Sequence, residues 1–239
     1  MKVEILSLID TTKSLITFIA IIVSALYLIS LSSKIRGFIY KQSYSFKEKS
    51  LLILLFGCLG ILASEFGILI LGITANVRDF IVIFSGIIGG PAVGIGAGLI
   101  SGMYRMTGIY WTGFTETLGS WTAIGCGVAT VGAGFLGAYL SKYKNINIRN
   151  ITRKQIWLLT TLAGLYQIIH LQVSVSLISP LYGDKTFLET FVLTAKSLLI
   201  PMGLINAIGM FLFLSIMKDT IIKKETEIAE KEILELELK

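Results

Sequence analysis

The chain has 239 residues, of which 54% are hydrophobic and 15% charged, and its mean hydropathy is +0.80. This composition excludes an ordinary soluble domain and indicates an integral membrane protein with one membrane domain. The formal net charge of +6 is typical of basic cytoplasmic loops in such a protein, and we expect no nucleic-acid partner.

The first third of the chain predicts two membrane spans. Thr11–Ser32 forms the first apolar stretch, and a basic loop follows at residues 33–49. Leu51–Ile73 forms the second stretch and carries one acid, Glu65, near its middle. An uninterrupted span needs roughly 20 apolar residues, and both stretches meet that length.

The stretch from Asn76 to Arg105 is apolar almost throughout but is broken by Gly89-Gly90-Pro91. Glycine costs about 1 kcal/mol and proline about 3 kcal/mol in a helix interior relative to alanine. We therefore predict two short helices, at about 79–89 and 91–106, that meet at Gly90-Pro91. A single kinked span is the alternative.

The rest of the chain alternates apolar spans with polar loops. Gly-rich and apolar stretches predict three further spans, and basic or polar segments separate them. The spans are Leu118–Leu140, Ile156–Ser179 and Thr190–Met217; the segments are 107–117, 141–154, 180–189 and a charged helical tail from 218.

The distribution of basic residues favours the broken pair as a hairpin that enters the membrane and returns. With the N-terminus outside, fifteen of the 21 Lys and Arg then lie in the cytoplasm and five outside. A single span would leave, at best, thirteen on one side and seven on the other. The predicted fold is therefore all-α: a polytopic bundle of five full spans plus a broken-helix hairpin, with a cytoplasmic C-terminus.

The tail places five small or apolar residues at alternating four- and three-residue spacing. This is a short heptad seam, which predicts a homodimer through the C-terminal helix. A solvated amphipathic helix is the alternative. The seam residues are Ile222, Thr226, Ala229, Ile233 and Leu236.

No phosphate-binding loop of Walker type, metal-ligand cluster or serine-nucleophile motif occurs in the sequence. We expect no catalytic residue, no cofactor and no metal site.

Three sets of residues resemble the membrane region of LytS-type receptors, the five-transmembrane input module of sensor histidine kinases and some diguanylate cyclases. The first is the most specific, and the others support it. They are Asn76-Val77-Arg78 with Gly86, Gly89 to Gly94 and Arg105; His170; and Ile200-Pro201-Met202 with Asn206 and Gly209.

The resemblance implies a sensory module of the prokaryotic plasma membrane, linked with two-component signalling and cell-wall turnover. It divides the chain into an extra N-terminal helix and loop (1–50), the sensor domain (51–217) and a cytoplasmic signalling helix (218–239). Family members usually continue into a kinase or cyclase, so we expect such an output partner and no enzyme within these 239 residues.

The broken hairpin also looks, more distantly, like the substrate-binding subunits of energy-coupling-factor vitamin transporters. A solute-binding transport subunit is therefore the alternative function, although function does not follow from fold alone.

Charged groups inside a bilayer are costly and usually face a cavity or a partner. We predict that Arg78 and Arg105 face one outer vestibule and hold a small anion such as a carboxylate. The alternatives are that Arg78 pairs with Asp79 or reaches the lipid headgroups, and that Arg105 pairs with Glu116.

Further polar residues are candidate ligand contacts: Asn76, Glu116, Gln167, His170 and Asn206. Asn76 is expected chiefly to cap the first short helix. His170, the only histidine, is more often a hydrogen-bonded core residue than a metal ligand, but its titration range suits a switch. Pro201 is expected to kink the last span.

Overall fold

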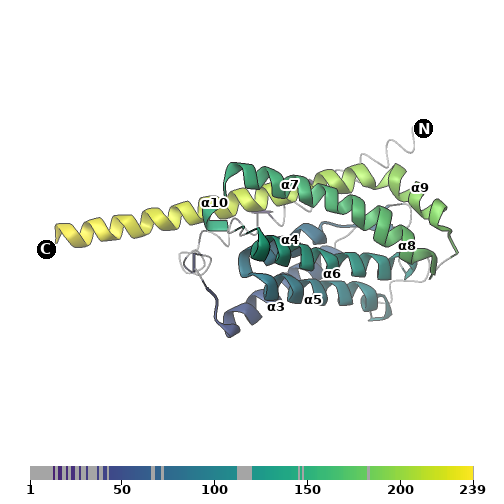
Figure 1. Ribbon diagram of the computed structural model, residues 1–239, viewed down its shortest axis with the longest axis horizontal. Helices are drawn as coiled ribbons and strands as arrows, with labels where there is room; N and C mark the ends of the chain where they lie inside the picture. The colour runs from purple at the N-terminus through teal and green to yellow at the C-terminus, as the bar shows by residue number, and fades with distance from the viewer. Residues whose placement is uncertain are drawn as a thin grey trace.

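The computed structural model describes residues 43–65, 68–70, 73–111, 120–144, 146, 148–181 and 184–238, together with single positions between 13 and 41. These residues form a bundle of helices from which one long helix projects (Figure 1). The predicted first span, Thr11–Ser32, and the candidate Glu116 lie largely or wholly outside the described residues.

The second predicted span is shorter than expected. Helix α3 covers Phe46–Glu65, and the strands β1 (Ile68–Ile70) and β2 (Ile73–Ala75) then form an antiparallel pair. Glu65 is therefore the last residue of its helix, and the prediction of a mid-span acid is wrong. Its Oε1 accepts a hydrogen bond from the Tyr104 hydroxyl at 2.8 Å.

The predicted break at Gly90 is confirmed. Helix α4 covers Arg78–Gly89 and helix α5 covers Pro91–Trp111. Gly90 between them has a φ of 81°, a left-handed conformation that residues with a side chain rarely adopt. A Cβ built on Gly94 would lie 2.8 Å from the Cα of Gly86, so the two helices fold back on each other. The single kinked helix is excluded.

Helix α6 (Ser120–Tyr143) packs against α5 with glycines at the contact. A Cβ on Gly98 would lie 3.1 Å from the Cα of Gly134, and one on Gly102 would lie 2.7 Å from the carbonyl oxygen of Gly127. Small residues at this spacing allow the two backbones to approach closely. A short 3-10 turn, η1 (Ile148–Asn150), follows.

The predicted span 156–179 is present but is not a uniform α-helix. Helix α7 (Arg153–Ile168) begins at a capping box in which Thr152 and Gln155 exchange hydrogen bonds. A π-helical segment, η2 (Ile169–Val175), comes next, and α8 (Ser176–Ile178) and the 3-10 turn η3 (Ser179–Leu181) end the span.

The predicted last span is two helices. Helix α9 covers Phe187–Ser197, and α10 runs from Leu199 to Glu237. The break lies at Leu198, and Pro201 lies in the first turn of α10. The prediction that Pro201 kinks the interior of the last span is therefore wrong. A proline ring clashes with the carbonyl four residues before it, here that of Ser197, and this explains why the preceding helix stops there.

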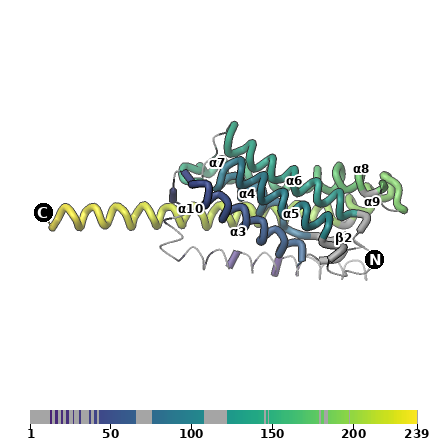
Figure 2. Tube along the Cα trace, turned by 90° about the horizontal axis from the view of Figure 1, so that it is seen from below, coloured from purple at the N-terminus to yellow at the C-terminus, as the bar shows by residue number. Residues whose placement is uncertain are grey.

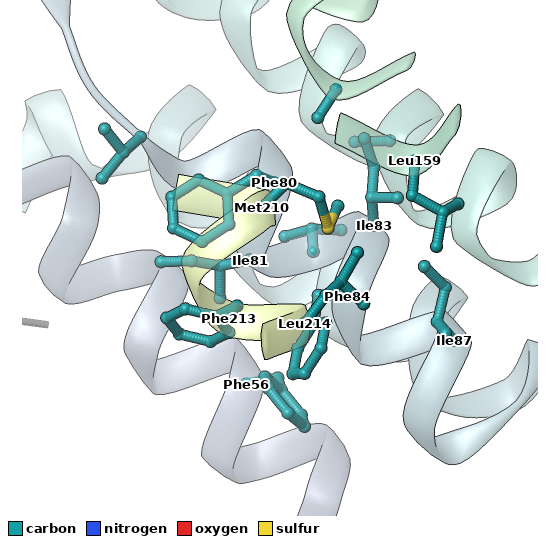
Figure 3. Close-up of a cluster of buried hydrophobic side chains, with 14 of the residues drawn as sticks. Phe56, Phe80, Ile81, Ile83, Phe84, Ile87, Leu159, Met210, Phe213 and Leu214 are labelled. Carbon is teal, nitrogen blue, oxygen red and sulfur yellow. The ribbon is translucent and has the colours of Figure 1, made fainter. Parts of the chain in front are cut away.

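Phenylalanine rings join α3, α4 and α10 in the core (Figure 3). The ring centre of Phe213 lies 5.2 Å from that of Phe80 and 5.0 Å from that of Phe84. Phe56 meets Phe84 at 6.0 Å. Edge-to-face pairs of this kind add about 0.5–1.5 kcal/mol each to the area they bury. The last helix is therefore packed firmly on the hairpin.

Among the described residues, three helices are long and apolar enough to cross a membrane: Thr122–Tyr143, Arg153–Ile178 and Leu199–Glu237. Helix α4, with 12 residues, rises only about 18 Å and cannot span a bilayer alone. Both views show α10 running along the bundle and leaving it at the end opposite α8 and α9 (Figures 1 and 2).

Candidate functional site

Arg78 lies at the start of α4 and is completely buried. Its Nε donates to the Thr130 hydroxyl at 2.7 Å, and its Nη1 donates to the Ser64 hydroxyl at 2.6 Å. A third, longer contact joins Nη2 to the carbonyl oxygen of Cys126 at 3.4 Å. The guanidinium group thus faces the protein interior and not an open vestibule, which corrects the prediction for this residue.

Asp79 is also buried, and it pairs with His170 from the π-helical segment η2. The Nδ1 of His170 faces the Oδ2 of Asp79, and the Thr130 hydroxyl lies 3.0 Å from its Oδ1. The Nε2 of Gln167 lies 3.2 Å from the same histidine nitrogen. Asp79 therefore connects α4 with α6 and with α7–η2.

The π-helical segment η2 places the side chain of His170 within reach of Asp79. In a π-helix the backbone bonds five residues back, and the Ser176 hydroxyl accordingly donates to the carbonyl of Leu171 at 3.0 Å. Such segments are uncommon and often mark functional sites.

Asn76 and Asn206 meet beside the start of α4. The side-chain oxygen of Asn76 accepts a hydrogen bond from the Arg78 backbone N–H at 3.3 Å. The N-cap of α4 is Val77 and has no side-chain cap bond, so the prediction that Asn76 caps this helix is wrong. The Nδ2 of Asn206 donates to the carbonyls of Met202, at 2.9 Å, and Asn76, at 3.5 Å. The last helix therefore directly contacts the group of buried polar side chains around Arg78 and Asp79, which we call the cluster.

Arg105, on α5, lies close enough to Arg78 and Cys126 to interact electrostatically with both. Its Nε and Nη2 are buried, and neither has a hydrogen-bond partner among the described residues. Its predicted alternative partner, Glu116, lies outside those residues.

Six buried polar atoms of this region have no hydrogen-bond partner in the described part of the chain. They belong to five of the predicted ligand-contact residues. The atoms are Asn76 Nδ2, Arg105 Nε and Nη2, Gln167 Oε1, His170 Nε2 and Asn206 Oδ1. Each such atom costs about 1–3 kcal/mol unless water or a ligand satisfies it.

Sequence reasoning selected most of the cluster but missed its central acid. It treated Asp79 only as a possible partner of Arg78, although an acid in an apolar stretch is itself a signal of function. Ser64 and Thr130 carry no such signal, because hydroxyl residues are common in membrane helices. Their roles follow only from the packing of α3 and α6 on α4.

The chain is similar to proteins named "Sensor protein LytS". It is 29% identical over 224 residues to those of Bacillus anthracis and Bacillus cereus, which covers 87% of this chain and 34% of each relative. It is 30% identical over 154 residues to that of Bacillus subtilis, which covers 64% of this chain and 23% of the relative. The chain thus spans about a third of the length of the first two relatives.

No solved structure matches the chain. The likeness to vitamin-transporter subunits therefore remains an analogy. The profile of one family, described as "5TMR of 5TMR-LYT", matches residues 32–220. That region contains all of the cluster and most of the described helices. The chain therefore belongs to this family, the LytS-type five-transmembrane receptor region, and is a multi-pass sensory module of the plasma membrane.

Proposed function

We propose that the module senses a small anion, such as a carboxylate, at the buried cluster around Arg105, and that α10 reports binding to a cytoplasmic kinase or cyclase output. The unpartnered buried atoms of the cluster carry this proposal. The relatives are named as sensor proteins and are about three times as long, which supports an output beyond the matched region. The proposal includes the family's link with cell-wall turnover.

The balance of charge favours an anion. Arg78 and Arg105 supply two positive charges, and Asp79 supplies one negative charge that is already engaged with His170. Arg78 is satisfied by neutral hydroxyl and carbonyl groups. The remaining positive charge is therefore best assigned to Arg105, whose Nε and Nη2 have no hydrogen-bond partner in the described part of the chain and suit the two oxygens of a carboxylate.

The remaining unpartnered atoms suit a ligand with a second polar group. Asn76 Nδ2 is a donor, whereas Gln167 Oε1 and Asn206 Oδ1 are acceptors. A carboxylate that also carries a carbonyl or hydroxyl group could satisfy both kinds. We therefore expect a short substituted carboxylate to bind better than a simple one.

A homodimer through the tail belongs to the same proposal. Ile233 and Leu236 are 56% and 72% exposed on the projecting part of α10. Apolar side chains at heptad positions are stable in water when a second helix covers them. A cysteine at Ile233 should therefore form a disulfide between two copies in a Cys58→Ser background, which removes the exposed native thiol. Lys231→Cys, on the outer face of the heptad, is the matched control; equal cross-linking at both positions would contradict the seam.

The binding proposal is tested by thermal unfolding of the purified full chain with a panel of short carboxylates. A ligand at 100 times its Kd should stabilise the protein by about 2.7 kcal/mol. Arg105→Gln should abolish this effect, whereas Lys185→Gln, an equal loss of charge before α9, should retain it. Stabilisation that survives Arg105→Gln would refute the proposed site.

A further inference from the structure

The other end of α4 borders a cavity that the proposed function does not use. Its volume is about 430 Å³, within the usual range for ligand sites. The hairpin tip at Gly89, Gly90 and Pro91 forms one wall. A Cβ placed on Gly90 would meet nothing within 4 Å, so the tip opens directly onto free space.

Three basic side chains from two separate parts of the chain line this cavity: Lys41, Lys49 and Arg149. Lys49 lies in the first turn of α3, and Arg149 lies in η1. None of its described lining residues is acidic. Ser43 and Tyr44 add hydroxyl groups to the lining, and hydroxyl groups are able to donate hydrogen bonds to an anion. The hydroxyl of Ser141, also in the lining, donates to the carbonyl of Ala138 at 3.0 Å.

Among the described residues that line the cavity, basic groups outnumber acidic ones. Lys41 pairs with Glu48, and this bond, with a hydrogen bond from the Ser45 backbone, lowers the pKa of Glu48 to about 2. The Glu48 carboxylate therefore stays ionised at neutral pH and offsets the charge of Lys41. Lys49 and Arg149 bring two further basic groups to the cavity lining. The Arg149 guanidinium lies over the Tyr40 ring, 4.9 Å from its centre.

The position of the cavity in the bundle indicates which class of ligand it binds. It lies at the end where η1 contacts α10 and from which the tail leaves. Its basic side chains come from the segments 33–49 and 141–154, which the positive-inside rule assigns to the cytoplasm. Basic pockets between helices at this level of a membrane bind phosphate-bearing head groups.

We propose that this cavity is a second anion site, which binds a phosphate group at the tip of the broken hairpin through Lys49 and Arg149. The phosphate belongs either to an anionic phospholipid or to a soluble phosphate-bearing anion. The site goes beyond the proposed function, because it lies at the opposite end of α4 from Arg78 and shares no residue with that cluster.

The experiment measures binding of two probes to the full chain purified in detergent. The probes are phosphatidylglycerol, with phosphatidylcholine as the uncharged comparison, and inorganic phosphate. Lys49→Gln and Arg149→Gln should each weaken binding of the active probe about fivefold, the contribution of one basic side chain near an anionic head group. Lys144→Gln, an exposed residue of the same loop region outside the cavity, should change binding less than twofold.

The outcomes distinguish a lipid phosphate from a soluble phosphate, and they distinguish this cavity from the proposed carboxylate site at Arg105. Binding of phosphatidylglycerol alone assigns the site to lipid, and binding of inorganic phosphate alone assigns it to a soluble anion. Arg149→Lys should retain binding, which shows that any loss in Arg149→Gln is a loss of charge and not of folding. Arg105→Gln should leave this site intact. Absence of binding by both probes, or an equal loss in Lys144→Gln, would overturn the proposal.

Discussion

Asn206 of α10 donates a hydrogen bond through Nδ2 to the backbone carbonyl of Asn76, 130 residues earlier in the chain. The bond joins the last helix to the start of α4, next to Arg78 and Asp79. From Asn206 the same helix continues without interruption to Glu237, a distance of about 46 Å. A shift at the cluster can therefore reach the end of the tail through one rigid element.

The first prediction concerns this connection. Asn206→Leu keeps the volume of the side chain but removes the bond to Asn76. Binding of a simple carboxylate should persist, because Arg105 is untouched, whereas a substituted carboxylate should lose the added affinity that Asn206 Oδ1 gives it. Any change that the simple carboxylate causes in disulfide formation at Ile233→Cys should be lost. Ser215→Ala, on the same helix beyond the cluster, is the control and should behave like the parent. An unchanged ligand effect in Asn206→Leu would show that the signal takes another route.

The second prediction concerns the buried pair of Asp79 and His170. Removing one partner of a buried ion pair leaves the other without compensation and costs about 3–5 kcal/mol. Asp79→Asn and His170→Gln should therefore each lower the stability strongly, and the double variant should lose less than the sum of the two. Unfolding in detergent measures all three. Additive losses would show that the two side chains are not coupled.

The third prediction concerns the hairpin tip. Gly90→Ala should destabilise the protein by about 1–2 kcal/mol, because alanine is strained at a φ of 81° although space for its Cβ is free. Gly203→Ala is the matched control inside α10, where the nearest atom lies 3.6 Å from the new Cβ. It should stabilise the helix by up to about 1 kcal/mol. The same sign in both variants would contradict this account of Gly90.

Sequence reasoning predicted the elements whose causes are local. The break at Gly90-Pro91 follows from the backbone limits of those two residues alone. The early end of α3 was missed because the segment 66–75 is apolar enough to continue a span, and only its β-branched residues hint at strands. The sequence predicted a kink at Pro201, whereas the helix breaks at Leu198. The difference arises because the proline ring clashes with the carbonyl four residues before it.

The cluster was predicted only in part, because its residues can be recognised locally but their contacts cannot. Polar residues in apolar stretches can be found from the sequence, and Asn76, Arg78, Gln167, His170 and Asn206 were. Which of them touch one another depends on the packing of helices that lie far apart in the chain. The π-helical turn that carries His170 to Asp79 has no signature in the residues 169–175.

The last prediction separates binding from stability at Arg105. In the absence of ligand, this side chain repels Arg78 and keeps two buried nitrogens without partners in the described part of the chain. Arg105→Gln should therefore leave the unliganded protein as stable as the parent or more stable by about 1 kcal/mol, the net value of a typical hydrogen-bond change, while abolishing stabilisation by carboxylates. Binding sites commonly show this conflict between stability and function. Thermal unfolding with and without ligand measures both effects. A loss of stability without ligand, reproduced by Glu116→Gln, would show instead that Arg105 is held by Glu116.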